Sequence, residues 1–499
     1  MAKLSLPGAE AAHSPRWLAL VVIVIAAFMT TLDDFIVFVA VPSIRRDLHM
    51  DASAIQWVAA GYVLAYGVAV VSGGRLGDIY GHKRVFILGL CGFTVTSLLC
   101  GLASNTPFLL AARALEGIAA AVMFPQVFSL IKRMFRQEEQ ALAFAVLGAV
   151  IGVAAIGGQL FGGVLLGANL WGLTWRPIFF VNIPVGILAM LAALPLLRES
   201  RSATATRIDG PGVLLASATL LLFIYPLVQG HDAGWPLWSF ALLIASVPAA
   251  WLFVYYERYR GAQVGSPLLE LALFRNPLFT QGVCVLLLET ALGSGLFFVL
   301  ALYLQSGYHF SPFEAGLAFT PMAITYTVGS LLTARLRRWL GTRILSVGIL
   351  IASLGTLWTF AVVTGAGSTL SLTSLLPLAV MGFGNALVAT PLPGLIVAVA
   401  GDDAAGAASG AISTAQQLGA ALGIALIGVV FFGSLGPQPA TADYARAFAN
   451  TLVYYTLGVC IAQMFLVVNL PVTLDESAKD CQTNESPPIL PANKESNLC

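Results

Sequence analysis

Five ionisable side chains lie inside long apolar stretches of the sequence, where a charge is costly to place. They are Asp33, Asp34, Arg113, Glu116 and Glu289. Charged residues within a membrane span are rare and commonly mark the paths of ions, protons or substrates. We therefore predict that these five residues couple proton binding to substrate binding.

Glu289 has no basic residue in its own apolar stretch, and residues 286–288 and 291–295 around it are apolar or small. Such surroundings favour the neutral form of a carboxyl. Proton coupling requires a carboxyl that takes up a proton in one conformation and releases it in another. The alternative is a permanently protonated carboxyl that hydrogen-bonds to a neighbouring helix.

Arg113 and Glu116 are three residues apart, so they lie on one face of a helix. They could form an internal ion pair that allows the helix to enter the membrane. A cation near a carboxyl also favours its charged form, so Arg113 could instead help a nearby acid to release its proton. Both interpretations stay open.

Asp33 and Asp34 are neighbours and therefore point about 100° apart on a helix. We expect one of them to face a central cavity and the other to face a neighbouring helix or the outer mouth. Asp34 shares a face with Phe38, an arrangement that suits a cationic aromatic ligand. In the alternative interpretation, both lie near the outer end of the span and are exposed to water.

Small residues recur between positions 148 and 163. Such patterns allow two helices to approach closely, and a sliding interface between two bundles would need this. The residues are Gly148, Gly152, Gly157, Gly158, Gly162 and Gly163, with Gln159 among them.

Fourteen apolar stretches are long enough to be membrane helices, which need roughly 20 residues to cross about 30 Å of hydrocarbon. The fold class is therefore an all-α, polytopic membrane protein with about 14 transmembrane helices. The predicted spans are 17–41, 55–75, 84–103, 106–130, 141–166, 175–197, 209–229, 236–258, 277–303, 313–334, 343–364, 369–397, 405–433 and 446–472.

The basic residues support this number of spans, because cytoplasmic loops are enriched in Lys and Arg. With the N-terminus inside, the inner loops hold 16 basic residues, and the outer loops hold only Arg45, Arg46, Arg176 and Arg446. This alternation predicts both termini in the cytoplasm of a bacterium, with the chain in its inner membrane. Arg113 is the one basic residue that lies away from the ends of a predicted span.

The composition excludes an ordinary soluble protein. Of the 499 residues, 58 % are hydrophobic and 10 % are charged, against roughly 25 % charged in soluble domains. The net charge of +1 gives no bias toward nucleic acid. Six cysteines, at positions 91, 100, 284, 460, 481 and 499, form no close-spaced metal pattern and are predicted to be unpaired.

The two ends of the chain differ in character. About 25 apolar residues follow Arg16, which is too long for the core of a signal peptide, so this segment is predicted to be the first span. After residue 472 the chain becomes polar, and we expect a disordered cytoplasmic tail over 473–499.

At these residues the chain resembles the major facilitator superfamily, and within it the fourteen-helix drug:proton antiporters. Residues 74–84 (GRLGDIYGHKR) are similar to the signature loop of the superfamily, with Gly74, Asp78, Gly81, Lys83 and Arg84 on its fixed positions. The other matching segments are 32–42 (LDDFIVFVAVP), 109–117 (LLAARALEG), 148–163 (GAVIGVAAIGGQLFGG) and 175–184 (WRPIFFVNIP).

This resemblance implies two six-helix bundles, 17–197 and 277–472, which rock around a central site. An inserted helix pair with its linkers would occupy 198–276, and 1–16 would be a cytoplasmic segment. The signature loop would act as a conformational latch, with Asp78 near a helix N-terminus of the second bundle, where the helix dipole favours an anion.

Four positions depart from the family pattern. Gln159 replaces a proline of the antiporter motif, and Glu116 replaces a glutamine. Phe35 and Phe38 replace a threonine and an asparagine of the first-span motif. The loss of the proline weakens the inference of antiport, and the extra acid could alter the proton stoichiometry or simply pair with Arg113.

The leading hypothesis is proton-driven export of small amphipathic or cationic drugs or antibiotics by alternating access. Such a transporter is not an enzyme, binds no metal or cofactor, draws its energy from the proton gradient and acts as a monomer in the lipid bilayer without nucleic acid. The alternatives are proton-coupled uptake or exchange of a metabolite, which Gln159 leaves open, and a membrane sensor that transports nothing.

Overall fold

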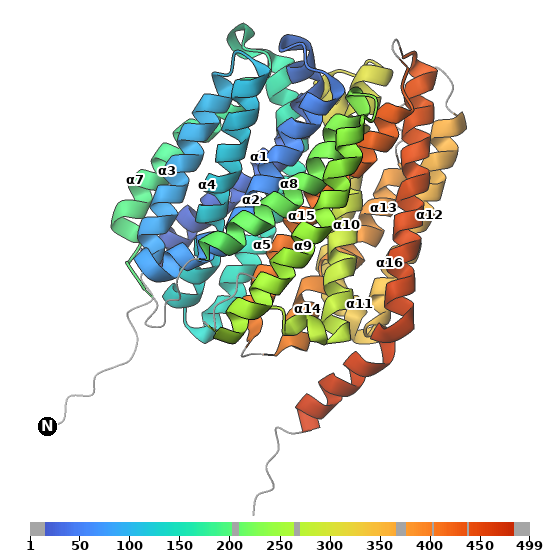
Figure 1. The fold of residues 1–499 in the computed structure, drawn as a ribbon. Helices are drawn as coiled ribbons and strands as arrows, with labels where there is room; N and C mark the ends of the chain where they lie inside the picture. Colours follow the sequence, from blue (N-terminus) through green and yellow to red (C-terminus); the bar gives the residue numbers. More distant parts are fainter. Residues whose placement is uncertain are drawn as a thin grey trace, which may run out of the picture.

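The computed structural model describes residues 15–201, 209–263, 270–365, 376–401, 404–436 and 439–483, and all of its regular elements are helices (Figure 1). Within these residues, 13 helical stretches are long and apolar enough to cross a membrane. A further helix, α16 (Thr441–Thr483), covers the remaining predicted span, 446–472. The prediction of an all-α protein with about 14 membrane helices is confirmed.

The first half of the chain forms six spans. Its helices are α1 (Pro15–Asp47), α2 (Ala52–Tyr80), α3 (His82–Gly101), α4 (Thr106–Met134), α5 (Gln137–Ala168), α6 (Pro177–Phe180) and α7 (Asn182–Leu196). Short helices α6 and α7 follow one another directly and together make one span. The predicted inserted pair is α8 (Gly210–Asp232) and α9 (Leu237–Gln263).

The second half contains two interrupted spans. Its helices are α10 (Pro277–Leu302), α11 (Pro312–Leu340), α12 (Arg343–Gly365), α13 (Pro377–Ala389), α14 (Leu392–Ala400), α15 (Ala405–Gly433) and α16. Helix α10 continues into a π-helical turn, Tyr303–Gly307. Helices α13 and α14 meet at Thr390 and Pro391 and form the predicted span 369–397, of which residues 369–375 lie outside the described chain.

Side chains that accept backbone N–H groups fix several helix starts. Asp51 accepts from the N–H of Ala54 at 2.7 Å at the start of α2, and Asn105 accepts from Phe108 at 3.0 Å at the start of α4. Ser311 and Glu314 form a capping box on α11. These caps satisfy donors that a helix leaves unpaired at its N-terminus, so the loops before these helices can be short.

The bundle has two ends. We call the end where α1 begins the basic face, since Arg16, Arg84, Arg133, Arg198 and Arg338 lie there by the order of the helices. The end where α1 finishes is the opposite face, and α1 to α7 lie beside α10 to α16 between them (Figure 1). The two halves meet where α2 packs against α15 and where α5 packs against α11.

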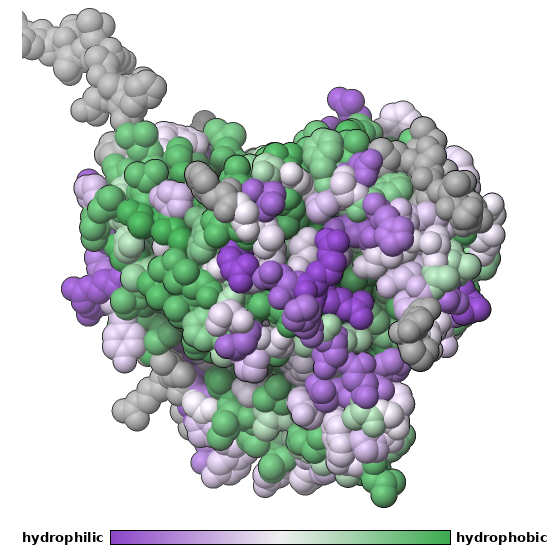
Figure 2. All heavy atoms as spheres, turned by 90° about the horizontal axis from the view of Figure 1, so that it is seen from above, coloured by the Kyte–Doolittle hydropathy of each residue, from purple (hydrophilic) through white to green (hydrophobic). Residues whose placement is uncertain are grey.

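Apolar side chains cover much of the outer surface. Leu88, Leu188, Ile244, Leu331 and Trp339 are all at least two-thirds exposed. Figure 2, which views one end of the bundle, shows hydrophilic residues gathered across its middle beside large hydrophobic areas. This distribution is the one expected where lipid rather than water surrounds the sides.

The C-terminal boundary differs from the prediction. Helix α16 continues to Thr483, so the disordered tail predicted from residue 473 is wrong for 473–483, and Figure 1 shows this end leaving the bundle. A helix satisfies its own backbone groups, so it can extend beyond the apolar stretch that begins it. Residues 484–499, like residues 1–14 of the predicted N-terminal segment, lie outside the described chain.

A buried charged cluster holds the inserted pair together. Asp209 is fully buried and accepts hydrogen bonds from the Gly212 N–H (3.0 Å) and the Tyr256 hydroxyl (2.8 Å). Its other oxygen lies 3.1 Å from Nε of Arg260. Arg75, near the end of α2, also interacts electrostatically with Asp209, so the cluster joins α8 and α9 to the first half.

The substitution Asp209→Asn should destabilise the protein, because it removes the negative charge that faces Arg260. We expect a loss of about 1–3 kcal/mol, measured as a lower melting temperature of the purified protein. Tyr256→Phe removes one hydrogen bond but keeps the charge, so it should lower the melting temperature less. Melting of Asp209→Asn at the temperature of the unsubstituted protein would contradict this account.

Candidate functional site

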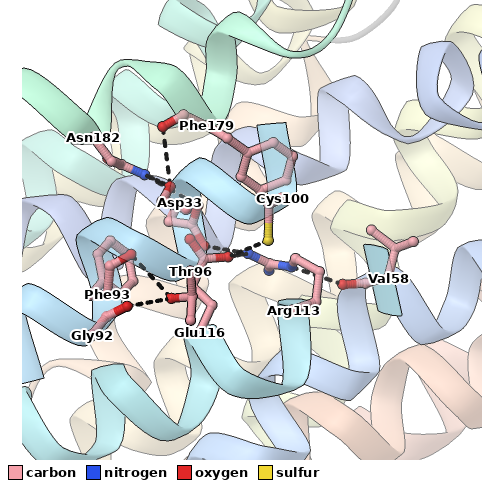
Figure 3. Close-up of polar contacts among 11 residues, drawn as sticks. Asp33, Val58, Gly92, Phe93, Thr96, Cys100, Arg113, Glu116, Phe179 and Asn182 are labelled. Atoms are coloured by element: carbon pink, nitrogen blue, oxygen red, sulfur yellow. Dashed lines mark hydrogen bonds and ion pairs between the residues drawn. The ribbon is translucent and has the colours of Figure 1, made fainter. Parts of the chain in front are cut away.

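Three charged side chains meet in the interior of the first half and form what we call the charged triad: Asp33 of α1 and Arg113 and Glu116 of α4 (Figure 3). Nη1 of Arg113 lies 2.5 Å from Oδ2 of Asp33 and 2.7 Å from Oε2 of Glu116. All three side chains are at most 1 % exposed. The arginine therefore shares one nitrogen between two carboxylates.

Polar groups on neighbouring helices complete the arginine's surroundings. Arg113 Nε donates to the backbone carbonyl of Val58 on α2 at 3.2 Å. Its guanidinium carbon lies 4.3 Å from the ring centroid of Tyr62, close enough for a cation–π interaction. The thiol of Cys100 on α3 donates to Glu116 at 3.3 Å.

A second set of bonds leads from Asp33 to α7. Nδ2 of Asn182 lies 3.5 Å from Oδ1 of Asp33 and 3.0 Å from Oγ of Ser97, and the Ser97 hydroxyl donates to the carbonyl of Phe179 (Figure 3). The triad thus links α1, α2, α3, α4 and α7. Any rotation of one of these helices would break a buried polar contact.

The charge of the triad suggests its chemistry. With both carboxyls ionised and Arg113 positive, the triad carries a net charge of −1 in a buried region. Uptake of one proton would make it neutral. Isolated charge is costly in such a region, so the geometry can hold a proton and respond when a neighbouring charge changes.

Asp34 faces a different direction from Asp33, as their spacing predicts. It is partly exposed, and its Oδ1 is buried without a hydrogen-bond partner in the described chain. Asp33 is fully buried, so the interpretation that both acids lie in water is wrong. Asp34 is therefore the more accessible acid of the pair.

Four phenylalanine rings meet at the contact between the halves. Two of them belong to α1, and one of these, Phe38, shares a helical face with Asp34. Phe35 and Phe38 of α1 lie 5.5 Å and 6.5 Å from Phe297 of α10, centroid to centroid. Phe297 stacks on Phe319 of α11 at 5.3 Å. We call these four rings the aromatic cluster.

Glu289 lies alone in the second half. It lines a cavity of about 20 Å³ together with Asn385 and Tyr455, which hydrogen-bond to each other at 3.1 Å. This volume is sufficient for about one water molecule. Among the described residues Glu289 has no ion pair, and the apolar surroundings predicted for it are present in Val285 and Leu292.

The signature loop is bound to its own half. Gly81 adopts φ = 105°, a conformation that favours glycine, and so allows the tight turn between α2 and α3. Lys83 Nζ donates to the Leu194 carbonyl at 2.6 Å, and Arg84 Nε lies 3.5 Å from a Glu199 oxygen. Gly74 lies beside Pro125 of α4.

The expected position of Asp78 needs correction. Asp78 is 41 % exposed, and its ion-pair partner in the described chain is His82, at 3.5 Å. Among the described residues, no hydrogen bond or ion pair joins Asp78 to a helix N-terminus of the second half, so the expected contact is not made there. That contact depends on how the two halves are placed, which the sequence alone does not determine.

The glycine-rich stretch of α5 packs between two helices over only part of its length. Gly158 and Gly162 face Phe35 and Ile36 of α1. A Cβ on Gly163 would lie 2.6 Å from the carbonyl oxygen of Pro312 on α11, so only a glycine permits this approach. Gly148, Gly152 and Gly157 face open space among the described residues, and Gly148 and Gly152 are the nearest of the set to the basic face.

A second contact between the halves shows the same gradient. Near the opposite face, a Cβ on Gly428 of α15 would collide with the Gln56 side chain. A Cβ on Gly67, midway along α2, would lie 2.9 Å from the Cβ of Gln417. A Cβ on Gly410, nearer the basic face, would lie 4.0 Å from the Val71 side chain. Gln305 also donates to the Val39 carbonyl at 2.9 Å near the opposite face. The halves therefore pack most closely near the opposite face and less closely toward the basic face.

The structure brings Asp33, Arg113 and Glu116 together and keeps Glu289 apart from them. It also adds Tyr62, Ser97, Cys100 and Asn182 to the first site and Asn385 and Tyr455 to the second, none of which sequence reasoning had found. Asn182 and Asn385 lie within predicted spans, where polar side chains are uncommon, and could have been found by that signal. Gln159 is buried, and its side-chain amide has no partner in the described chain.

The cysteine prediction is confirmed where the structure describes the side chains. Cys91, Cys100, Cys284 and Cys460 are free thiols. Cys499 and the side chain of Cys481 lie outside the described part.

Long apolar helices in two halves, with buried charges inside each half, define a multi-pass membrane transporter rather than an enzyme. The chain belongs to the Major Facilitator Superfamily, whose family model matches residues 23–424. The predicted resemblance to this superfamily is confirmed. Its substrate is a small molecule, and its surroundings are a lipid bilayer.

Relatives of known name agree with this assignment. The chain is 38 % identical over 478 residues to a probable actinorhodin transporter of Streptomyces coelicolor. The matched stretch covers 95 % of this chain and 83 % of the relative. It is 35 % identical over 463 residues to a puromycin resistance protein of Streptomyces alboniger, with 92 % and 90 % covered. A solved bacterial homologue of the human lysosomal transporter Spinster, inward-facing and unoccupied, has a TM-score of 0.63 at 17 % identity, with 96 % and 100 % covered, and shares the fold.

The substitution Arg113→Gln should be strongly destabilising, because it leaves Asp33 and Glu116 buried without a cation. Removing one partner of a buried ion pair costs about 3–5 kcal/mol, so we expect a large fall in the melting temperature of the purified protein. Adding Glu116→Gln to this variant removes one of the two uncompensated acids and should restore part of the loss. A single variant that melts normally, or a double variant less stable than the single one, would contradict the triad's role.

Proposed function

We propose that this protein exports small amphipathic, cationic compounds across the bacterial cytoplasmic membrane in exchange for protons. The observation that carries this proposal is an excess of acid in the interior. Asp33, Asp34, Glu116 and Glu289 lie within the spans, and Arg113 is the one basic residue that the sequence places away from the ends of a predicted span. Carboxyls that lack a cation in apolar surroundings are natural binding sites for protons.

The proton sites have different surroundings in the two halves. The charged triad keeps a fixed positive charge beside two acids, so binding of a cation nearby would change the balance between them. Glu289 has Asn385 and Tyr455 near it and no cation among the described residues. We infer that Glu289 exchanges a proton as the halves rock and that the triad responds to the charge at Asp34.

The substrate class follows from Asp34 and the aromatic cluster. The unpartnered oxygen of Asp34 could bind a cationic group, and rings such as Phe38 and Phe297 could stack on an aromatic or apolar part of the same ligand. The names of the relatives, an antibiotic transporter and an antibiotic resistance protein, support an antibiotic or a similar drug as the substrate.

The direction of opening follows from the charge distribution. Basic residues favour the cytoplasmic side, so we assign the basic face and both termini to the cytoplasm. In this proposal the close packing near the opposite face, between Gly428 and Gln56, lies on the outer side. In this proposal the protein acts as a monomer and needs neither a cofactor nor nucleic acid, because the proton gradient supplies the energy.

The substitution Glu289→Gln should abolish transport driven by a pH gradient while leaving the protein folded, because the amide keeps the shape of the side chain but cannot bind and release a proton. Purified protein in proteoliposomes, with a cationic dye and an imposed pH gradient, provides the measurement. Exchange of dye without a gradient should persist. Glu314→Gln is a matched control, since Gln can also complete the capping box at the start of α11.

Three outcomes would reject parts of this proposal. Gradient-driven transport at the normal rate in Glu289→Gln would remove this residue from proton coupling. Dye that moves in the same direction as the protons, in vesicles of known orientation, would mean uptake rather than export. No dye movement in any condition would favour a non-transporting role.

The substitution Asp34→Asn should affect cationic substrates selectively, because the lost interaction is with a positive charge. A charge-assisted hydrogen bond contributes about 1.5–3 kcal/mol, so the affinity for a cationic dye should fall about tenfold or more. The affinity for a neutral dye of similar size should change little. Equal losses for both dyes would assign Asp34 to coupling or folding instead of recognition.

A further inference from the structure

A large pocket lies at the basic face, away from both acid sites. Its volume is about 430 Å³, and it is formed by the start of α1, the end of α4 and the end of α7 with the chain that follows. Its polar lining includes Arg16, Arg133, Arg198, Glu199 and Ser200. Because three of these side chains are arginines, we call it the arginine pocket.

The acids near the pocket are already paired. Glu139 lies 2.8 Å from Arg16. Glu199 lies 3.5 Å from Arg84, which is not part of the pocket lining. Arg133 donates to a backbone carbonyl, that of Arg201, at 3.1 Å. Arg198 has no hydrogen bond or ion pair in the described part of the chain. Two positive charges therefore remain without a negative partner at the pocket.

One further nitrogen also lacks a partner. Nε of Arg16 is buried and makes no hydrogen bond with the described residues, although the same guanidinium pairs with Glu139 through Nη2. A phosphate group has several acceptor oxygens and suits the fixed donor fork of arginine. The unmet donors and the charge thus favour a phosphate-bearing anion.

The apolar part of the pocket distinguishes a lipid from a soluble anion. Leu130, Met134 and Leu196 form its apolar lining. On the same helices, a few residues farther into the membrane, Leu18 and Leu191 are 56 % and 59 % exposed on the bundle surface. An acyl chain could lie along these leucines while its headgroup occupies the pocket.

We propose that the arginine pocket binds the headgroup of an anionic phospholipid of the leaflet at the basic face. Basic pockets between membrane helices on the cytoplasmic side recognise such headgroups. The leaflet is cytoplasmic in the orientation proposed above, but the binding itself does not depend on that orientation or on the transported substrate.

The pocket adjoins the signature loop. The Ser200 carbonyl accepts the backbone N–H of His82 at 3.0 Å, and Glu199 accepts that of Lys83 at 3.2 Å. A headgroup bound to Arg198 would hold the segment that carries these two contacts. Anionic lipid would therefore stabilise the loop between α2 and α3 in addition to occupying the pocket.

Native mass spectrometry of the purified full chain tests the proposal, with phosphatidylglycerol and phosphatidylcholine as the probes. We expect tighter binding of phosphatidylglycerol, and weaker binding by about fivefold for each arginine removed in Arg133→Gln/Arg198→Gln. The matched control is Arg335→Gln/Arg338→Gln, which removes two exposed arginines of α11 at the same face and should leave the affinity unchanged. Equal melting temperatures of both double variants would show that folding is intact.

Each other outcome overturns the assignment. Equal binding of the two lipids would mean that charge does not select the ligand. Equal losses in the two double variants would indicate a general attraction to a basic surface. Displacement of phosphatidylglycerol by millimolar inorganic phosphate would identify a soluble anion as the ligand. None of these measurements involves transport, so failure here is separate from failure of the proposed export.

Discussion

The cost of placing charge inside a protein surrounded by lipid governs the first half of this structure. Arg113 is tolerated because Asp33 and Glu116 lie within 2.7 Å of it and because a carbonyl and an aromatic ring complete its surroundings. These partners come from different helices, so the helices must keep one relative rotation. The contacts that stabilise the buried charge of Arg113 therefore also fix the geometry of the bundle.

The second half meets the same constraint in another way. Glu289 has no arginine nearby in the described chain, but it has a small cavity, an amide and a phenol. A proton or a water molecule can satisfy a carboxyl in such a place, whereas a fixed cation would hold it charged. The two halves therefore stabilise their buried acids by different means, one by a fixed cation and the other by a polar cavity.

Sequence reasoning reached the helices and the charged residues because both depend on local composition. Apolar length predicts spans, and the rarity of charge within a span identifies Arg113 and Glu289 without any structure. It could not pair Asp33 with Arg113, which lie 80 positions apart, since that contact depends on how α1 and α4 pack. The contact predicted for Asp78 was missed for a further reason, because it depends on how the two halves are placed relative to each other.

The conformation also explains why one glycine-rich helix behaves differently along its length. Gly163 lies against α11 so closely that a larger side chain would separate the halves, whereas Gly148 faces open space in the described chain. If the halves rock, the contact must move from the end of α5 toward its beginning, and glycines in both parts permit close approach in either state. The inserted pair is attached to α2 at both faces, because Asp209 and Arg75 interact at one end of α2 and Asp232 accepts the Ser53 N–H at the other. Helix α8 also packs against α15, so the pair bridges the two halves.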